Sequence, residues 1–350
     1  MKIDFIRTRT FFLTLLLSVS SHFITCVSWA QEKHPHDTTY VQAFEDRLLI
    51  APFVSTRDFD VYMKPAGQEE DLVQFHPNVS NVFGFQTVYK TLALKVGFRL
   101  PIEDFESRNY GNTRYFDLNI NIVKPKFLIE GTIKDYRGMV DLKSSEYAPP
   151  KEYYIRSDLR ANYLFLNYIH IFNNKEFSYR SAFLFREKQL KSAGSFLAMA
   201  SISRFAMSAD SAFLPVERKE NFEQIASLEE FNAPAIGLGG GYGQTFVLGD
   251  FFIGLSGILA IEFKNMTYQL AATNESLRDP QSSLFMDFRL SLGYHQPRWV
   301  IGIVGQSDTN FFRISTVDGR TIYTDFSLYV GWRMRPPKFL KKVEKVNPFR

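Results

Sequence analysis

Cysteine is almost absent from this chain, since only one of its 350 residues, Cys26, is a cysteine. It lies within the first thirty residues, which have the features of a secretory signal: basic residues near the start, an apolar run over 11–27, and small residues at Ser28 and Ala30. We expect cleavage after Ala30, which also removes the cysteine. The mature chain then has no cysteine for a disulfide, a thiol nucleophile or a metal site.

Long apolar runs are also missing. The run over 11–27 contains three serines and a histidine and falls short of the roughly 20 apolar residues of a membrane helix, which favours a signal peptide over a membrane anchor. A lipoprotein site at Cys26 is disfavoured, because Phe23-Ile24-Thr25 before it lacks the small residues that such a site needs. No later stretch approaches about 18 consecutive apolar residues, so we expect no transmembrane helix after the signal.

Charge of one sign is not in excess either. The formal net charge is +4, and it falls to +2 once the first thirty residues, with three basic residues and one acid, are removed. That value is too small to argue for a nucleic-acid partner. Aromatic residues make up 16% of the chain, with 35 Phe and 17 Tyr. Such an excess is expected where rings lie at two membrane–water boundaries, and it also suits an aromatic-rich soluble core.

The chain does contain repeated alternation of apolar and polar residues, as in TLALKVGFRL at 91–100. In an extended strand Leu92, Leu94 and Phe98 point one way, while Lys95 and Arg99 point the other way. The apolar face would form the core of a soluble sandwich, or meet lipid in a membrane barrel whose charges line the lumen. Ten residues tilted near 45° rise roughly 23 Å, close to the apolar band of about 25 Å in an outer-membrane barrel. The expected strands are 47–62, 73–88, 91–100, 114–123, 126–138, 159–172, 177–187, 235–247, 250–263, 283–295, 298–312 and 321–334.

The connections between these strands favour the membrane barrel. Tight turns largely alternate with long polar connections, as expected for short periplasmic turns and long external loops. The tight turns are expected at 89–90, 124–125, 173–174, 248–249 and 296–297, and the long connections near 64–72, 100–113, 140–157, 265–282 and 313–320. With both ends of the chain in the periplasm the strand number is even. We therefore predict an all-β, antiparallel transmembrane β-barrel of about twelve strands.

One segment does not fit twelve strands, SAGSFLAMASISRFAM at 192–207. Parity is kept if 188–233 is an external or lumen-inserted element, which we slightly prefer. The alternative is that 192–207 is an ordinary strand and that another strand has been overlooked, which gives fourteen.

Four glycines, Gly237, Gly239, Gly241 and Gly243, share the face that would line the lumen. This stripe either lets an inserted element such as 188–233 approach closely, or relieves strain in a strongly curved strand. The sequence does not separate the two explanations.

Charged residues of both signs fall on the polar faces of the expected strands. In a narrow barrel such charges pair and fill the interior, which is the structural explanation. The functional alternative is a polar conduit or a small-solute site, with Arg160, Arg180 and Arg186 as a basic patch on neighbouring strands. The lumen candidates are Arg160, Arg180, Arg186, Asp287, Arg289 and Asp325.

Patterns typical of catalysis or metal binding are weak. No histidine is followed two residues later by serine, the pair that barrel phospholipases carry on one strand. GLGGGYG at 237–243 has no following Lys-Ser/Thr and lies in a strand pattern, so a nucleotide loop is not expected. His34 and His36 are best explained as part of a polar terminus. We therefore predict no catalytic residue, no metal and no cofactor.

Several stretches resemble the domain of unknown function 4421 family, which comprises predicted outer-membrane barrels mainly of Bacteroidota. These stretches are FHPN at 75–78, VYKTLALKVGF at 88–98, TRYFDLNI at 113–120, IRSDLR at 155–160, IFNNKEFSYRSAF at 171–183 and QLKSAGSFL at 189–197. The block from IRSDLR to SAGSF is the most specific. The resemblance implies a location and a barrel, and no activity or catalytic residue.

The predicted organisation is a signal peptide at 1–30, a periplasmic segment at 31–46, a barrel at 47–334 and a basic tail at 335–350. The expected function is structural, or that of a narrow, porin-like polar conduit with a partly plugged lumen. A barrel enzyme acting on lipid or on a lumen-bound substrate is a second possibility, and a soluble periplasmic ligand-binding β-protein is a third. Expected partners are outer-membrane lipid and the barrel-assembly machinery, with a small solute as an option and no nucleic acid.

Overall fold

A computed structural model describes residues 36–44, 46–67, 72–79, 81–100, 108–146, 153–214, 227–270 and 276–338. The chain divides into two units, 1–35 and 36–350, of which the second contains all the described residues. The expected signal peptide and most of the expected basic tail lie outside the described residues, so their boundaries stay predictions.

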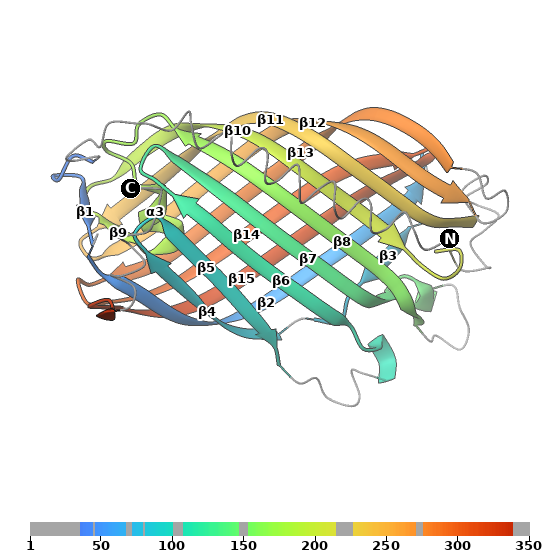
Figure 1. Ribbon diagram of the computed structural model, residues 1–350, viewed down its shortest axis with the longest axis horizontal. Coiled ribbons are helices and arrows are strands. Elements are labelled where there is room, and N and C mark those ends of the chain that lie inside the picture. Colours follow the sequence, from blue (N-terminus) through green and yellow to red (C-terminus); the bar gives the residue numbers. More distant parts are fainter. Residues whose placement is uncertain are drawn as a thin grey trace. The chain divides into compact units, whose positions relative to one another are not determined.

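Twelve antiparallel strands close into a barrel (Figure 1). They are β2 (Leu48–Pro65), β4 (Asn81–Tyr89), β5 (Leu92–Arg99), β6 (Arg114–Val123), β7 (Phe127–Asp141), β8 (Tyr154–Ile171), β10 (Ala193–Ser208), β11 (Leu228–Leu248), β12 (Phe251–Leu270), β13 (Ser276–His295), β14 (Trp299–Ile314) and β15 (Val317–Met334). Each pairs with the next, and β15 pairs with β2 over most of its length to close the ring. The predicted all-β, twelve-stranded transmembrane barrel is confirmed.

A short strand, β3 (Val73–His76), modifies the ring on one side. The strands β4, β5 and β6 are shorter than the others, and β3 pairs with both β2 and β7 beyond them. At one end of the barrel the wall therefore contains all twelve strands. At the other end, where β4, β5 and β6 have ended, β3 joins β2 to β7.

Tight turns gather at one end of the barrel, the turn end, where β4–β5, β6–β7, β11–β12 and β13–β14 connect. The other end, the loop end, carries the longer connections and one two-residue turn at 315–316. Two of the expected long connections, 265–282 and 313–320, are mostly strand. Their polar residues are explained by strands that continue past the apolar band, since β12 extends to Leu270 and β14 to Ile314.

Two of the segment assignments from the sequence are wrong. The segment 192–207 is not an insert, because β10 pairs with β8 on one side and with β11 on the other. The expected strand at 177–187 is instead a six-residue helix, α3 (Tyr179–Leu184), followed by the short strand β9 (Glu187–Gln189). All six residues of α3 are buried, so the segment has no polar face by which a helical period could be recognised. The strand number remains twelve, because β10 is added to the wall and the strand expected at 177–187 is removed from it.

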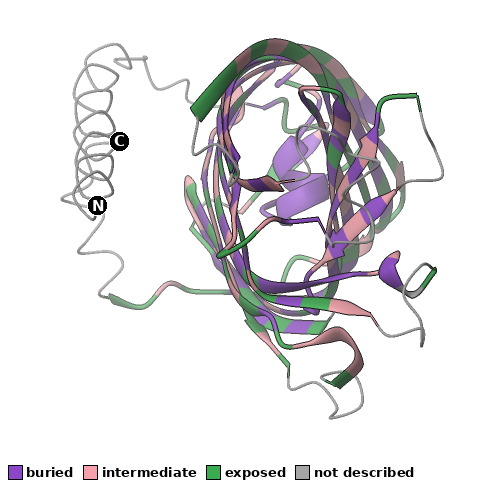
Figure 2. Cartoon of the chain, turned by 90° about the vertical axis from the view of Figure 1, so that its right-hand side faces the viewer, coloured by how far each residue is buried: buried purple, intermediate pink, exposed green. Residues whose placement is uncertain are grey.

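Apolar side chains cover the outside of the wall. Leu92, Phe98, Leu238 and Phe263 are 52–62% exposed and alternate along their strands with buried residues. Figure 2 shows this alternation as exposed and buried bands around the ring, with α3 inside it. The orientation expected for a membrane barrel is therefore correct, and the soluble alternative with its apolar faces turned inward is not. Among the described residues no helix has the length and apolar character of a membrane span.

Candidate functional site

The lumen contains three layers, which we name from the turn end to the loop end. The plug layer is made of residues 172–192, called the plug, and of the N-terminal segment 36–44. The charged layer consists of ion pairs between wall strands. The aromatic layer consists of rings that meet inside the barrel near the loop end.

The plug is ordered by its own hydrogen bonds. Ser178 caps α3, since its Oγ accepts a hydrogen bond from Ser181 N at 3.1 Å, and Phe185 ends the helix with a left-handed φ of 55°. Gln189 Nε2 donates to Glu176 O at 2.5 Å, which joins the two sides of the plug. Because these groups have partners, a short helix is stable inside the barrel.

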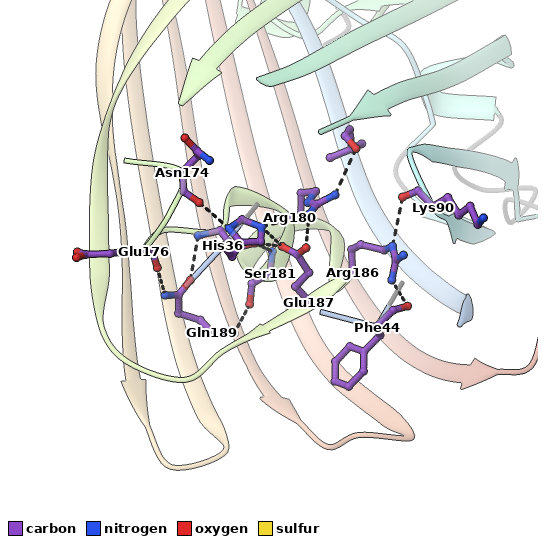
Figure 3. A network of polar contacts seen from close by, with 12 residues as sticks. His36, Phe44, Lys90, Asn174, Glu176, Arg180, Ser181, Arg186, Glu187 and Gln189 are labelled. Atoms are coloured by element: carbon purple, nitrogen blue, oxygen red, sulfur yellow. Dashed lines mark hydrogen bonds and ion pairs between the residues drawn. The ribbon is translucent and has the colours of Figure 1, made fainter. Parts of the chain in front are cut away.

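The N-terminal segment binds the plug through a second short sheet and a buried polar cluster. The strand β1 (Val41–Ala43) pairs with β9. His36 Nδ1 donates to Asn174 O at 2.5 Å, and His36 Nε2 lies 3.1 Å from the carboxylate of Glu187, which also pairs with Arg180 (Figure 3). The cluster links two segments that are about 140 residues apart in the chain.

Glu187 is the acidic centre of this cluster. Burial raises the pKa of its carboxyl group, but the Arg180 guanidinium and the hydrogen bond with His36 lower it by more, so the pKa falls to about 2. Ser178 Oγ also donates to this carboxylate. Glu187 is therefore held as a fully ionised, buried carboxylate.

The wall satisfies the carbonyl groups at the end of α3. Gln86 Nε2 donates to Leu184 O at 3.3 Å, and Arg333 Nη2 donates to Phe185 O at 2.7 Å. These contacts come from β4 and β15. Together with the ion pair between Lys188 and Asp250 in the β11–β12 turn, they fix the plug to opposite sides of the barrel.

Three wall glycines lie directly beneath the plug. An added Cβ would be 2.6 Å from Ala182 Cβ at Gly254, 2.7 Å from the Phe185 ring at Gly302 and 2.9 Å from the Phe177 ring at Gly243. The wall strands therefore present glycine where the plug comes closest.

The predicted glycine stripe is only partly explained by this contact. Of its four members, Gly243 alone faces the plug, whereas a Cβ at Gly239 or Gly241 would meet the backbone of β12 at 2.3 Å and 2.0 Å. Gly237 faces Ser201 and Glu262. At Gly243 the element that approaches is Phe177 of the plug and not the expected segment 188–233, whereas Gly239 and Gly241 lie against the backbone of β12.

The charged layer begins with Arg57 on β2. Its guanidinium pairs with Asp117 at 2.6 Å and with Asp325 at 2.8 Å, and Asp325 also accepts from Lys95 at 3.2 Å. These four groups belong to β2, β6, β15 and β5, so the network connects strands that are not all neighbours. Two cations and two carboxylates balance the local charge.

A second network crosses the lumen. Arg289 on β13 forms paired bonds of 2.7 Å with both oxygens of Glu130 on β7, and it also bonds Asp287 at 2.7 Å. Beyond it Glu262 pairs with Lys264 at 2.9 Å and accepts from Asn310 at 2.8 Å. All these carboxylates are buried, and each has a partner.

A cavity remains between the charged networks and the plug. The space open to the centres of water molecules is about 80 Å³, which is on the order of five waters. Both signs of charge line it, including Lys134, Asp308 and Arg289, together with Tyr179 of α3. Its size suits trapped water better than a solute.

The aromatic layer fills the lumen near the loop end. The Phe59 ring on β2 lies 6.1 Å from Phe205 on β10, although these strands are on opposite sides of the ring. Phe205 in turn contacts Phe231 at 5.3 Å and Phe312 at 6.0 Å, and all four rings are at most 5% exposed. These rings meet across the interior and narrow the lumen at this level.

The six residues predicted to line the lumen lie at three different kinds of position. Asp287, Arg289 and Asp325 face the lumen and carry its ion pairs. Arg180 and Arg186 are buried in the lumen as expected, but they belong to the plug and not to a wall strand.

Arg160 is on the outer face, where it pairs with Asp135 at 2.7 Å, so the proposed basic patch of Arg160, Arg180 and Arg186 does not exist. The orientation of β8 was misjudged because both of its faces are apolar. Tyr163 and Phe165 face inward, and Leu164 and Leu166 face outward.

No pattern in the sequence indicates the role of Arg57 or Glu187. Their partners Asp117 and His36 lie 60 and 151 positions away in the chain, so nothing local marks them as neighbours. Among the described residues no group of three His, Cys, Asp or Glu could hold a metal ion. His34 lies outside these residues, and His36 binds the plug.

The chain is similar to one protein family and to several solved structures. The model of the family described as Domain of unknown function (DUF4421) matches residues 35–334. No curated protein matches. The solved structures that match include the outer membrane protease OmpT of Escherichia coli, with 12% identity over 83% of this chain and 98% of that chain and a TM-score of 0.39. The translocator domain of the autotransporter NalP from Neisseria meningitidis also matches, with 10% identity over 93% and 97% and a TM-score of 0.32.

Proposed function

This chain belongs to the domain of unknown function 4421 family, and we propose that it acts as a closed, structural barrel of the outer membrane. In this proposal the signal peptide is cut after Ala30, the barrel-assembly machinery inserts the mature chain, and the filled lumen serves as the core that holds the wall together. Its long connections then face the outside of the cell and its plug faces the periplasm.

The observation that carries the proposal is the contact of side chains across the lumen at three levels. The plug binds β4, β12 and β15, the Arg289–Glu130 pair joins β13 to β7, and the Phe59–Phe205 contact joins β2 to β10. A channel for free diffusion leaves its lumen polar and hydrated, whereas this lumen is closed by rings on one side and by the plug on the other.

The alternative is a conduit that the plug closes. It is favoured by one observation, the cavity lined by charges of both signs. In that case removal of the plug alone would open a path. In a closed structural barrel it does not, because the aromatic layer remains.

Conductance in planar bilayers separates the two. We expect no channel current from the purified protein, and none from a variant in which residues 174–190 are replaced by a short Gly-Ser turn between β8 and β10. Heat-modifiable migration on a gel verifies that each variant is a folded barrel. Steady current from the plug deletion would favour the conduit, and current from the intact protein would overturn the proposal.

A further inference from the structure

Three arginines lie side by side on the outer face of the wall. In the antiparallel register Arg114 on β6 is directly opposite Arg137 on β7, and Arg137 is directly opposite Arg160 on β8. All three are exposed. We call them the arginine row, and the three adjacent strands that carry it are at the front of Figure 1.

Like charges directly opposite each other on neighbouring strands are unfavourable. One acid offsets the row, since Asp135 accepts from Arg160 Nε at 2.9 Å and from Arg160 Nη2 at 2.7 Å. In the part of the chain that the structure describes, neither Arg114 nor Arg137 has an ion-pair partner. Among the described residues, the row therefore contains two arginines at directly opposite positions of β6 and β7 whose charges have no acidic partner.

The backbone holds the row in place. Gly138, with φ of 88°, forms a bulge directly after Arg137, and an added Cβ there would be 2.4 Å from Asn112 O. Thr113 Oγ1 donates to Gly138 O at 2.7 Å. This bond ties the residue before Arg114 to the residue after Arg137, so the two arginines are fixed relative to each other.

The row lies at the boundary of the apolar band on the loop-end side. Toward the turn end, the next outward-facing positions are Phe116, Asp135 and Asn162, and the positions after them are Leu118, Ile133 and Leu164. At the turn end of these strands, the band includes Phe127 and Tyr168, whose ring centroids are 5.7 Å apart. From Phe127 to Arg137 the strand extends about 33 Å, which at a tilt near 45° is roughly 23 Å across the membrane. The arginine row is thus at the level of the lipid headgroups.

We propose that Arg114, Arg137 and Arg160 bind the phosphate of an anionic lipid headgroup in the leaflet nearest the loop end. Guanidinium groups donate paired hydrogen bonds to phosphate oxygens, and two uncompensated arginines match the charge of a phosphomonoester. The acyl chains of that lipid lie on Phe116, which is 54% exposed, and on the apolar rows beneath it. The proposal does not depend on whether the lumen conducts.

The test uses a fluorescent label just below the row. Leu164→Cys in the chain from residue 31 onward, which contains no other cysteine, provides one labelling site, and the native Leu164 is 37% exposed on the outer face. Quenching by dibrominated phosphatidic acid is compared with quenching by dibrominated phosphatidylcholine in otherwise identical nanodiscs. We expect phosphatidic acid to associate about tenfold more strongly, given that each basic residue near a surface contributes a several-fold effect.

The double variant Arg114→Gln/Arg137→Gln is expected to reduce this preference to about one- or twofold, since the remaining Arg160 is paired with Asp135. Arg320→Gln is the matched control: it removes one exposed arginine from the outer face of β15, where the guanidinium lies over the Tyr62 ring, and it should leave the preference unchanged. Equal quenching by both lipids, or a preference that survives the double variant, overturns the proposal.

A soluble anion is the competing occupant. Inorganic phosphate at the same concentration should not abolish the preference, because it lacks the acyl chains; if it does, the site binds free phosphate and the lipid proposal is wrong. Native mass spectrometry of the unlabelled protein after exposure to phosphatidic acid gives a second measurement, in case the label disturbs folding. We expect retained lipid with the native chain and its loss in the double variant.

Discussion

Arg289 and Glu130 are joined by two parallel hydrogen bonds of 2.7 Å across the lumen, one to each carboxylate oxygen. The two residues belong to β13 and β7, which are separated by four strands in one direction around the wall. Arg289 also bonds Asp287, so one guanidinium contacts two buried carboxylates. Because Arg289 has two carboxylate partners, a substitution of Arg289 should destabilise the protein more than a substitution of Glu130.

Loss of Arg289 should be far more harmful than loss of the Glu130 charge. Arg289→Met leaves two buried carboxylates without their cation and should lower the free energy of unfolding by about 3–5 kcal/mol. Glu130→Gln keeps the Asp287 pair and an acceptor oxygen, and should cost about 1–2 kcal/mol. Urea unfolding in lipid vesicles, followed by tryptophan fluorescence, measures both. A larger effect of Glu130→Gln would show that the pair does not stabilise the barrel in this way.

Plug docking should be sensitive to a single methyl group at Gly254. Gly254→Ala places a Cβ 2.6 Å from Ala182 Cβ, so the plug must shift, and hydrogen exchange in residues 174–190 should rise at least severalfold. Gly240→Ala is the control, because its Cβ would be 3.4 Å from Leu197 O, at the edge of ordinary contact. Equal exchange in the two variants would mean that the plug is not held against β12.

Acid should release the N-terminal segment from the plug. The pKa of Glu187 is about 2 in the folded protein, below the ordinary glutamate value of 4.5, so the folded state binds its proton less readily than the unfolded state does. The stabilisation is therefore complete above about pH 4.5 and is lost as the pH falls toward 2, with a size on the order of 3 kcal/mol. Cleavage of the N-terminal segment by an acid-active protease should increase over this interval.

Glu187→Gln supplies the comparison for the acid experiment. It removes the charge that titrates while keeping an acceptor for Arg180, so the segment should be weakly held at neutral pH and should change little between pH 4.5 and 2. An unchanged pH dependence in this variant would assign the acid effect to other groups.

The apolar band predicts a sharp dependence on depth along the outer face of β12. Leu259 is 52% exposed in the band, and Asn265 is exposed on the same face closer to the loop end. Leu259→Arg should cost about 2–4 kcal/mol and Asn265→Arg about 0–1 kcal/mol, as for cations near the centre and the edge of a bilayer. Unfolding in vesicles measures both, and equal costs would contradict membrane contact at Leu259.

The wall could be predicted from the sequence because its signal is local. The alternation at 91–100 and at 283–295 gives the strand, its face and its orientation from adjacent residues alone. The plug could not, since α3 is buried on every side and its sequence alternates as well as a strand does. Arg160 was assigned to the lumen because both faces of β8 are apolar, so its sequence has no contrast between an inner and an outer face. The segment 192–207 was left out of the wall because 177–187, which contains the helix α3, was taken for a strand in its place.

The contents of the lumen were the least predictable part. Ion pairs such as Arg57–Asp117 depend on which strands become neighbours after the ring closes, and a single sequence does not record those distances. The sequence predicted that charges of both signs would share the interior. It also indicated that these charges would pair and fill a narrow barrel, but it did not predict which residues would pair with which.

The plug begins and ends at adjoining positions of the wall, because Phe172 N donates to Phe196 O and Ile171 pairs with Leu197. The plug is therefore an insertion between β8 and β10, and its presence does not alter the register in which these two strands pair. A segment of another length between β8 and β10 would leave the pairing of the wall strands unchanged, so a reporter or a binding loop can be grafted there.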